Sequence, residues 1–187
     1  MTKKILFNDK YCLTEAVLCG AKTMTRRVLK EGILLGNWEE TAKHLPYEVG
    51  DIVAIAQSYK EVYPNADFEM IGDKFMTESA GWTNKMFVRA DLMPHHIRIT
   101  DIKIERLQDI SKEDCLKEGI TFIESLSIMG YDAYFFTVKP KARQIYGNIL
   151  FFSSPQRAYA DLIEKISGRG TWKRNPWVVV YTFERVD

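Results

Sequence analysis

The chain has 187 residues, which suits a single domain with a substantial core. Its composition, 46% hydrophobic and 27% charged, excludes a disordered polypeptide. Its formal net charge of +1 is low for a protein that wraps duplex nucleic acid, so any nucleic-acid contact must come from a local patch.

Neither a membrane span nor a metal site is indicated. Residues 1–4 are followed by only a brief apolar run, and no run approaches transmembrane length. The adjacent pair His95-His96 has no third ligand nearby. Metal-ligand spacing is also lacking among the cysteines, which are Cys12, Cys19 and Cys115. We expect a cytoplasmic protein without membrane contact, metal or organic cofactor.

The first 59 residues are predicted to form two strands with a helix between them. A strand is expected at 4–7, and apolar residues at helical spacing predict a helix at 9–19 that stops at Gly20. Residues 28–49 have no regular period and are expected to be irregular. Alternation then predicts a strand at 51–59.

The middle of the chain is predicted to hold a polar excursion at 60–82 and strands at 86–90 and 96–107. The last of these is long, and its apolar positions alternate with one change of phase. They are Ile97, Ile99, Ile102 and Ile104.

The remaining elements include two helices with clear start signals. A capping-box pattern begins at Ser111 and the helix ends at Gly119, while Ser154-Pro155 opens a second helix that runs to residue 167. Residues 121–150 have no steady period, and 177–184 must be a strand. Several strands with few short helices indicate an α+β protein built on a small β-barrel.

The segment from Gly20 to Arg27 concentrates reactive side chains. A hydroxyl beside a lysine, here Thr25 and Lys22, is a possible activated nucleophile, and paired arginines can hold an anion. Residues three apart in a regular strand face opposite sides, so these two meet only if the chain turns at Gly20. Taken alone, the segment is also compatible with a solvated basic loop.

Four motifs are spread along the whole chain. They are Gly20-x-Lys22-x-x-Thr25-x-Arg27, Pro46-Tyr47-x-x-Gly50-Asp51, Ile99 to Asp114 with Glu118-Gly119-Ile120, and Trp172-x-x-Asn175-Pro176-Trp177-Val178 with Phe183-Glu184. Together they resemble the ASCH domain family, a branch of the PUA-like RNA-binding barrels, and its larger phage-type members in particular. The resemblance implies a single domain over 1–187, a PUA-like barrel with short helices at its ends, and variable insertions at about 60–85 and 121–150.

The resemblance also implies a reaction. In the family's bacterial N4-acetylcytidine amidohydrolases, a lysine, a threonine and a glutamate act together, and these fall on Lys22, Thr25 and Glu118. Thr25 would attack the acyl carbonyl with Lys22 as base, and Glu118 would orient Lys22 or pass a proton to the leaving amine. The adjacent Arg26 and Arg27 are expected to bind substrate, with Arg27 on the oxyanion or on a substrate phosphate.

The chain departs from the family pattern at residues 56–59. An Arg-Glu-Thr-Trp-like stretch is usual there, and this chain has Ala56-Gln57-Ser58-Tyr59. Two charges are thereby missing from the expected pocket wall. Gln57 can still hydrogen-bond a base edge but cannot act as a carboxylate, and we expect Gln57 and Tyr59 to contact substrate.

Glu118 lies at a helix C-terminus, where the helix dipole disfavours negative charge unless a cation such as Lys22 or Arg27 compensates. That position favours a functional role. Glu113 and Asp114 belong to the first helical turn, where acids are expected for capping, and are left out of the site.

Two other functions fit the same family. One is a non-catalytic RNA-binding module, and the other is a ribonuclease in which Lys22 and Arg27 stabilise a phosphorane-like charge. Two tryptophans could stack on a base or simply pack in the core, and six basic residues could form a phosphate-binding face. These residues are Trp172, Trp177, Lys139, Lys141, Arg143, Arg169, Lys173 and Arg174. The expected partner is a modified nucleoside or single-stranded RNA, and the sequence does not specify an oligomeric state.

Overall fold

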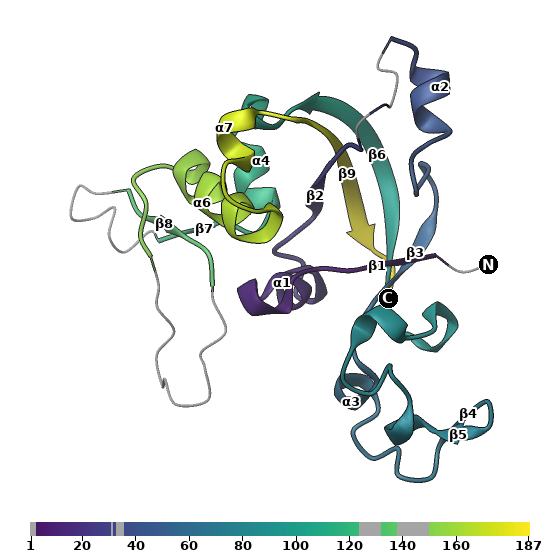
Figure 1. Ribbon diagram of the computed structural model, residues 1–187. Helices are drawn as coiled ribbons and strands as arrows, with labels where there is room; N and C mark the ends of the chain where they lie inside the picture. The colour runs from purple at the N-terminus through teal and green to yellow at the C-terminus, as the bar shows by residue number, and fades with distance from the viewer. Residues whose placement is uncertain (1–2, 31, 33–35, 124–131, 138–149) are drawn as a thin grey trace.

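A mixed five-stranded sheet forms the centre of the computed structural model, which describes residues 3–30, 32, 36–123, 132–137 and 150–187 (Figure 1). In spatial order its strands are β1 (Lys3–Ile5), β3 (Ile52–Ile55), β6 (His96–Arg106), β9 (Trp177–Arg185) and β2 (Met24–Val28). Among the described strands of this sheet, β1 and β3 pair in parallel and the other neighbours are antiparallel. The α+β class is confirmed. In the described strands β1 and β2 are the two edges of this sheet, so a closed barrel stays a prediction.

The phase change in the isoleucine pattern corresponds to a β-bulge in β6. Pairing passes from Ile99 opposite Phe183 to Asp101 opposite Thr182, which leaves Thr100 as the extra residue. Side chains beyond the bulge therefore alternate in the opposite phase. As a result Lys103 and Glu105 leave the face that carries Ile99 and reach the site described below.

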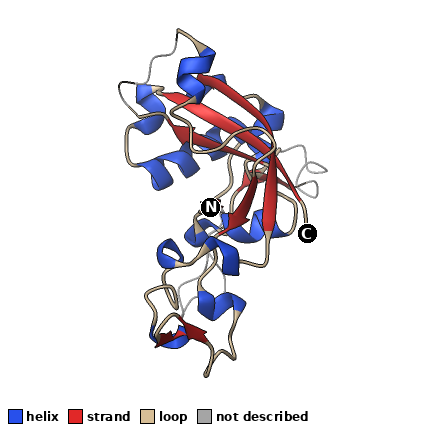
Figure 2. Ribbon diagram, turned by 90° about the vertical axis from the view of Figure 1, so that its right-hand side faces the viewer, coloured by secondary structure: helices blue, strands red, loops and turns tan. Residues whose placement is uncertain are grey.

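The described helices lie in the chain segments between strands (Figure 2). They are α1 (Leu13–Leu18), α2 (Trp38–Ala42), α3 (Tyr59–Val62), α4 (Lys112–Lys117), α6 (Pro155–Ser167) and α7 (Thr171–Arg174). As predicted, α6 begins at Ser154, whose hydroxyl accepts a hydrogen bond from the Arg157 amide, with Pro155 in its first turn. Its apolar face is buried in the main core through Ala158, Leu162 and Ile163.

Several predicted elements differ from the observed ones. The helix expected at 9–19 is divided at Cys12, whose φ of 53° separates the 3₁₀ turn η1 (Asp9–Tyr11) from α1. The strand expected at 51–59 ends at Ile55, and α3 starts at Tyr59. No strand occurs at 86–90; two 3₁₀ turns, η3 (Lys85–Phe87) and η4 (Ala90–Leu92), flank the buried Val88. The irregular segment at 28–49 contains α2.

A second, smaller core lies beyond β3, around Tyr59. It is formed by Ala54, Ala56, Tyr59, Ala66, Met76, Val88 and Met93. The hairpin of β4 (Met70–Ile71) and β5 (Lys74–Phe75) extends from it, as Figure 1 shows. The other short elements are β7 (Thr121–Phe122), β8 (Tyr134–Phe135), η2 (Met76–Glu78) and η5 (Leu107–Asp109). Among the described residues no helix has the length and apolar character needed to cross a membrane.

β1 and the loop after it are tied to this second core. The Lys4 ammonium donates to the carbonyls of Met86 and Val88 at 2.7 and 2.6 Å. The Lys85 ammonium donates back to the Phe7 carbonyl and to Asp9, both at 2.5 Å. The loop that follows β1 is therefore held in place by Lys85, which comes from the chain segment that forms the second core.

Ile99→Ala tests the central position of β6. Ile99 is fully buried between β3 and β9, so its truncation should lower the unfolding free energy by about 2–5 kcal/mol, measured by urea denaturation. The matched control Ile52→Ala, at a half-exposed position in β3, should cost less than about 1 kcal/mol. Equal losses in the two variants would contradict the assigned core.

Candidate functional site

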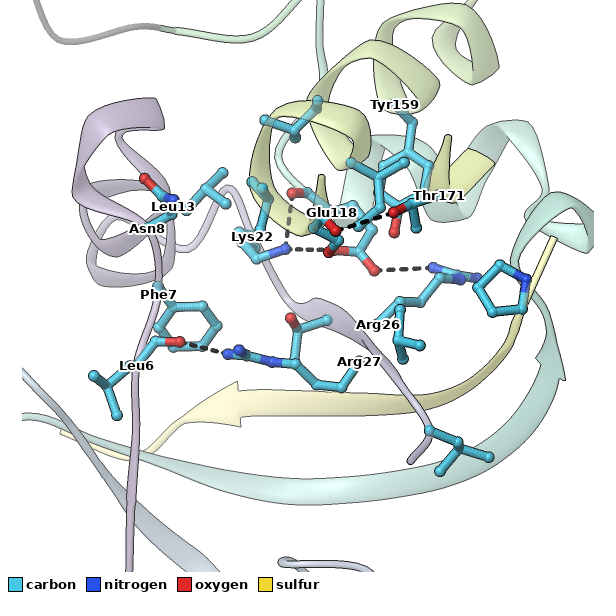
Figure 3. Close-up of a pocket in the computed structure, with 18 of the residues that line it drawn as sticks. Leu6, Phe7, Asn8, Leu13, Lys22, Arg26, Arg27, Glu118, Tyr159 and Thr171 are labelled. Atoms are coloured by element: carbon cyan, nitrogen blue, oxygen red, sulfur yellow. Dashed lines mark hydrogen bonds and ion pairs between the residues drawn. The ribbon is translucent and has the colours of Figure 1, made fainter. Parts of the chain in front are cut away.

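A cavity of about 620 Å³ lies along the edge strand β2 (Figure 3). That volume is in the range of small-molecule sites. Its walls come from the loop after β1, from α1, from the end of α4, and from α6 and α7. The polar and charged lining residues are Asn8, Lys22, Thr25, Arg26, Arg27, Glu118, Tyr159, Ser167, Thr171 and Arg174. Five of the seven residues predicted from sequence thus line one cavity.

The chain turn required to bring Lys22 to the site is present at Gly20, whose φ is +79°. The Lys22 amide then donates to the Ala16 carbonyl at 2.9 Å, and the Thr23 amide donates to the Lys117 carbonyl at 2.9 Å. These bonds tie the segment before β2 to the end of α4. Lys22 is consequently placed beside Glu118, 96 positions later in the sequence.

Lys22 and Glu118 form a buried ion pair. Lys22 Nζ donates to Glu118 Oε2 at 2.6 Å and to the Glu118 backbone carbonyl at 2.8 Å. The two side chains are only 2% and 5% exposed. Two of the three ammonium hydrogens are thereby used by one residue, which fixes the direction of the lysine side chain.

Arg26, and not Arg27, is the second cation on Glu118. Arg26 Nη1 donates to Glu118 Oε1 at 3.1 Å, so the carboxylate is held from both sides. Lys22 and Arg26 together compensate the unfavourable helix-end position of Glu118. Of the two cations considered from the sequence, Lys22 pairs with Glu118. Arg27 instead donates to the Leu6 carbonyl, as the dashed line in Figure 3 marks.

The rest of the Arg26 guanidinium is also engaged. Its Nε and Nη2 donate to Glu105 Oε1 at 2.9 and 2.6 Å, and Nη2 donates to Asp114 Oδ2 at 2.8 Å. Arg26 was expected to bind substrate, but this geometry makes it the residue that positions three carboxylates. Lys103 completes the cluster, 2.9 Å from Glu105 and 3.2 Å from Asp114.

Sequence reasoning missed Glu105 and Asp114 as members of this cluster. Asp114 does take part in the capping turn, since its amide donates to the Ser111 hydroxyl, but its carboxylate binds Arg26. Glu105 could have been found by continuing the alternation of β6 through the phase change at Thr100. No sequence pattern indicated that the Asp114 carboxylate would bind Arg26.

The charges of the cluster shift the pKa of its members in different directions. Burial lowers the pKa of Lys22; Glu118 raises it in part, and Arg27 and Arg26 lower it further. Burial would raise the pKa of Asp114, but hydrogen bonds from Arg26 and Lys103 lower it overall. Lys22 is therefore easier to deprotonate than an ordinary lysine, as a catalytic base requires.

Thr25 shares the cavity with Lys22 but is not hydrogen-bonded to it in the described structure. The threonine is only 5% exposed and lies in β2, directly opposite Tyr181 of β9. Lys22 precedes the strand, so the alternation rule that would separate the two side chains does not apply. A ligand in the cavity would be in reach of both.

Gln57 and Tyr59 do not line this cavity. Tyr59 is buried in the second core, where its hydroxyl accepts a hydrogen bond from the Arg89 amide at 2.8 Å. The Oε1 atom of Gln57 is buried and has no hydrogen-bond partner among the described residues. The structure therefore does not bring these two side chains together with the other five.

Of the other candidate residues, Arg174 lines the cavity, while the two tryptophans pack against the protein. Trp172 contacts Tyr159 edge to face, and the Arg106 guanidinium lies 4.3 Å over the Trp177 ring. Within the described residues, no group of three His, Cys, Asp or Glu side chains is placed to hold a metal ion. The basic run at 139–143 lies outside the described residues.

Arg26→Gln tests the cluster. The change leaves three carboxylates without their common partner, so the unfolding free energy should fall by about 3–5 kcal/mol. Arg98→Gln is the matched control, because Arg98 pairs with Glu184 on the exposed side of the same sheet and should cost less than about 1 kcal/mol. A comparable, small loss in both variants, measured by chemical denaturation, would argue against the cluster.

No known protein family and no curated protein matches the sequence. Two solved structures are similar to the chain. A protein of family DUF984 from Enterococcus faecalis V583 is 14% identical, with a TM-score of 0.38, over 94% of this chain and 67% of its own. An ASCH domain from Lactobacillus crispatus JV V101 is 10% identical, with a TM-score of 0.40, over 98% and 78%. At these values neither likeness establishes the activity of this chain.

Proposed function

We propose that the protein is an ASCH-type amidohydrolase that removes the acyl group from the exocyclic nitrogen of an acylated cytidine. The observation that carries the proposal is the buried Lys22–Glu118 pair in a cavity that Thr25 also lines. These are the three positions at which the sequence resembles the signature of the family's amidohydrolases. The curved sheet, with edges β1 and β2, would then correspond to a PUA-like barrel.

The first half of the reaction is acyl transfer to Thr25. Lys22, in its neutral form, takes the hydroxyl proton while Thr25 Oγ forms a bond to the acyl carbonyl carbon. The carbonyl oxygen becomes an oxyanion. Arg27 lies two positions along β2 from Thr25 and forms no ion pair with a carboxylate within the described residues, so its guanidinium is available to stabilise that charge.

The second half releases cytidine and regenerates the threonine. The bond between the acyl carbon and N4 breaks, and the leaving nitrogen takes the proton from the Lys22 ammonium, which Glu118 orients. A water molecule then attacks the acyl carbon while neutral Lys22 takes its proton. The bond between the acyl carbon and Thr25 Oγ breaks, and Lys22 returns the proton to Oγ. The products are cytidine and the free carboxylic acid, and Lys22 returns to its initial state.

Incubation with N4-acetylcytidine, followed by chromatography of released cytidine, tests this function. Thr25→Val keeps the shape of the side chain but removes the nucleophile, and Glu118→Gln removes the charge that orients Lys22. Each should lower kcat/KM by at least about 100-fold.

Thr23→Val is the matched control, since Thr23 is two residues away and does not line the cavity. Its kcat/KM should stay near the wild-type value. Absence of turnover in the wild type, with equal and salt-sensitive binding of single-stranded RNA by wild type and Thr25→Val, would reject the hydrolase and favour the RNA-binding module.

The pH dependence of kcat/KM tests Lys22 as the base. Only the neutral amine accepts a proton, so kcat/KM should rise with pH and level off above the pKa of Lys22. The midpoint should lie below 10.5, the ordinary lysine value, because burial lowers this pKa. Arg27→Gln removes a cation that lowers it, and should move the midpoint to higher pH. An unchanged midpoint in this variant would contradict the assignment; Arg98→Gln serves as the distant control.

A further inference from the structure

The three arginines that line the cavity differ in how their charge is compensated. Arg26 binds three carboxylates. Arg27 and Arg174 also line the cavity, yet within the described part of the chain neither forms an ion pair with a carboxylate. An uncompensated guanidinium at the wall of a cavity attracts an anionic group of a ligand. Arg27 lies two residues from Thr25 and is assigned to the oxyanion in the proposed reaction. Arg174 has no role in that reaction.

The Arg174 side chain is held in a defined position. Its Nη2 donates to the Thr171 hydroxyl at 3.0 Å and its Nη1 to the Arg169 carbonyl at 3.3 Å. Gly170 leaves room for it, because a Cβ there would lie 3.2 Å from Arg174 Nη1. The remaining N–H groups of the guanidinium have no partner among the described residues, so a ligand can bind them without displacing a protein contact.

The turn that carries Arg174 is itself fixed to α6. The Glu164 carboxylate accepts hydrogen bonds from the amides of Gly170 and Trp172 at 2.5 and 2.7 Å. The Thr171 hydroxyl is buried and donates to the Gly168 carbonyl at 2.7 Å. Arg174 is therefore placed in advance, which lowers the entropy lost when a ligand binds.

Arg174 belongs to α7, the last helix before β9, and the chain from α7 enters β9 beside the end of β2. Val28 lies opposite Val178, and the Leu29 amide donates to the Trp177 carbonyl at 3.0 Å. Thr25 lies three residues earlier in β2, which is roughly 10 Å along the strand. The lining of the cavity includes Thr25 and Val28 together with Pro176 and Arg174.

Apolar side chains also line the cavity, among them Val28, Leu162, Ile163, Ile166 and Pro176. They suit the neutral part of a nucleotide, its base and sugar. A cavity that combines this apolar lining with Lys22 and Thr25 and with an uncompensated guanidinium fits a ligand that carries both an amide and a phosphate.

We propose that Arg174 binds the phosphate of the substrate, so that the preferred substrate is an N4-acylated cytidine nucleotide and not the nucleoside. This inference rests on the proposed function for the identity of the base. The phosphate can belong to a free 5′-monophosphate or to the backbone of a strand, since both present the same oxygens to a guanidinium.

Binding of the unacylated products tests the phosphate subsite without any hydrolysis. Isothermal titration calorimetry should give a Kd for cytidine 5′-monophosphate at least about tenfold lower than that for cytidine, and the preference should weaken with added salt. Arg174→Gln should reduce this ratio severalfold or more. Lys173→Gln is the matched control, because it removes the same charge from the adjacent, exposed residue outside the cavity, and should keep the wild-type ratio.

Hydrolysis rates distinguish the two sources of phosphate. N4-acetylcytidine, its 5′-monophosphate and a short oligoribonucleotide containing one acetylated cytidine are compared, and either phosphorylated substrate should exceed the nucleoside in kcat/KM. The phosphorylated substrate with the higher kcat/KM shows whether the phosphate belongs to a free nucleotide or to an RNA backbone. Equal Kd values for cytidine and its monophosphate, no binding of either, or an equal loss of preference in Lys173→Gln would overturn the inference. Preferential binding of the monophosphate with no hydrolysis of any substrate would instead reject the proposed function and leave the phosphate subsite standing.

Discussion

A buried carboxylate held between two buried cations organises this protein. Glu118 binds Lys22 on one side and Arg26 on the other. Burying charge is costly unless it is compensated, and here the carboxylates of Glu105, Asp114 and Glu118 are all paired with cations in one connected network. The carboxylates are paired only when the end of α4, the edge strand β2 and the part of β6 beyond its bulge are all in place. The fold and the site therefore share one constraint.

The same network gives each charged residue a separate task. Arg26 holds Glu118 from the side away from Lys22, so the carboxylate has a second partner besides the lysine. Burial lowers the pKa of Lys22, while Glu118 raises it in part. Under the proposed function, this balance would act on the group that transfers the proton.

The sequence was informative where a residue's place depended on local signals. The turn expected at Gly20 is present and precedes Lys22. The grouping of Lys22 with Glu118, which are paired in the structure, came from the family resemblance and not from local signals. The roles of Arg26 and Arg27 could not be assigned, because β2 was not recognised as a strand and only its alternation separates the two side chains. Tyr59 was misplaced for a different reason: a capping box at Ser58 ends the extended segment and starts a helix that buries the ring in the second core.

The attachment of the loop after β1 to the second core has a consequence for divergence. Phe7 lines the cavity, yet its carbonyl is held by Lys85 from a part of the chain that does not touch the cavity. Changes in the chain segment that forms the second core can move Phe7 at the cavity wall while every charged residue of the site stays in place. Ligand preference in such an architecture can evolve at a distance, through insertions that alter how one loop is supported, without the stability loss that follows from disturbing a buried ionic network.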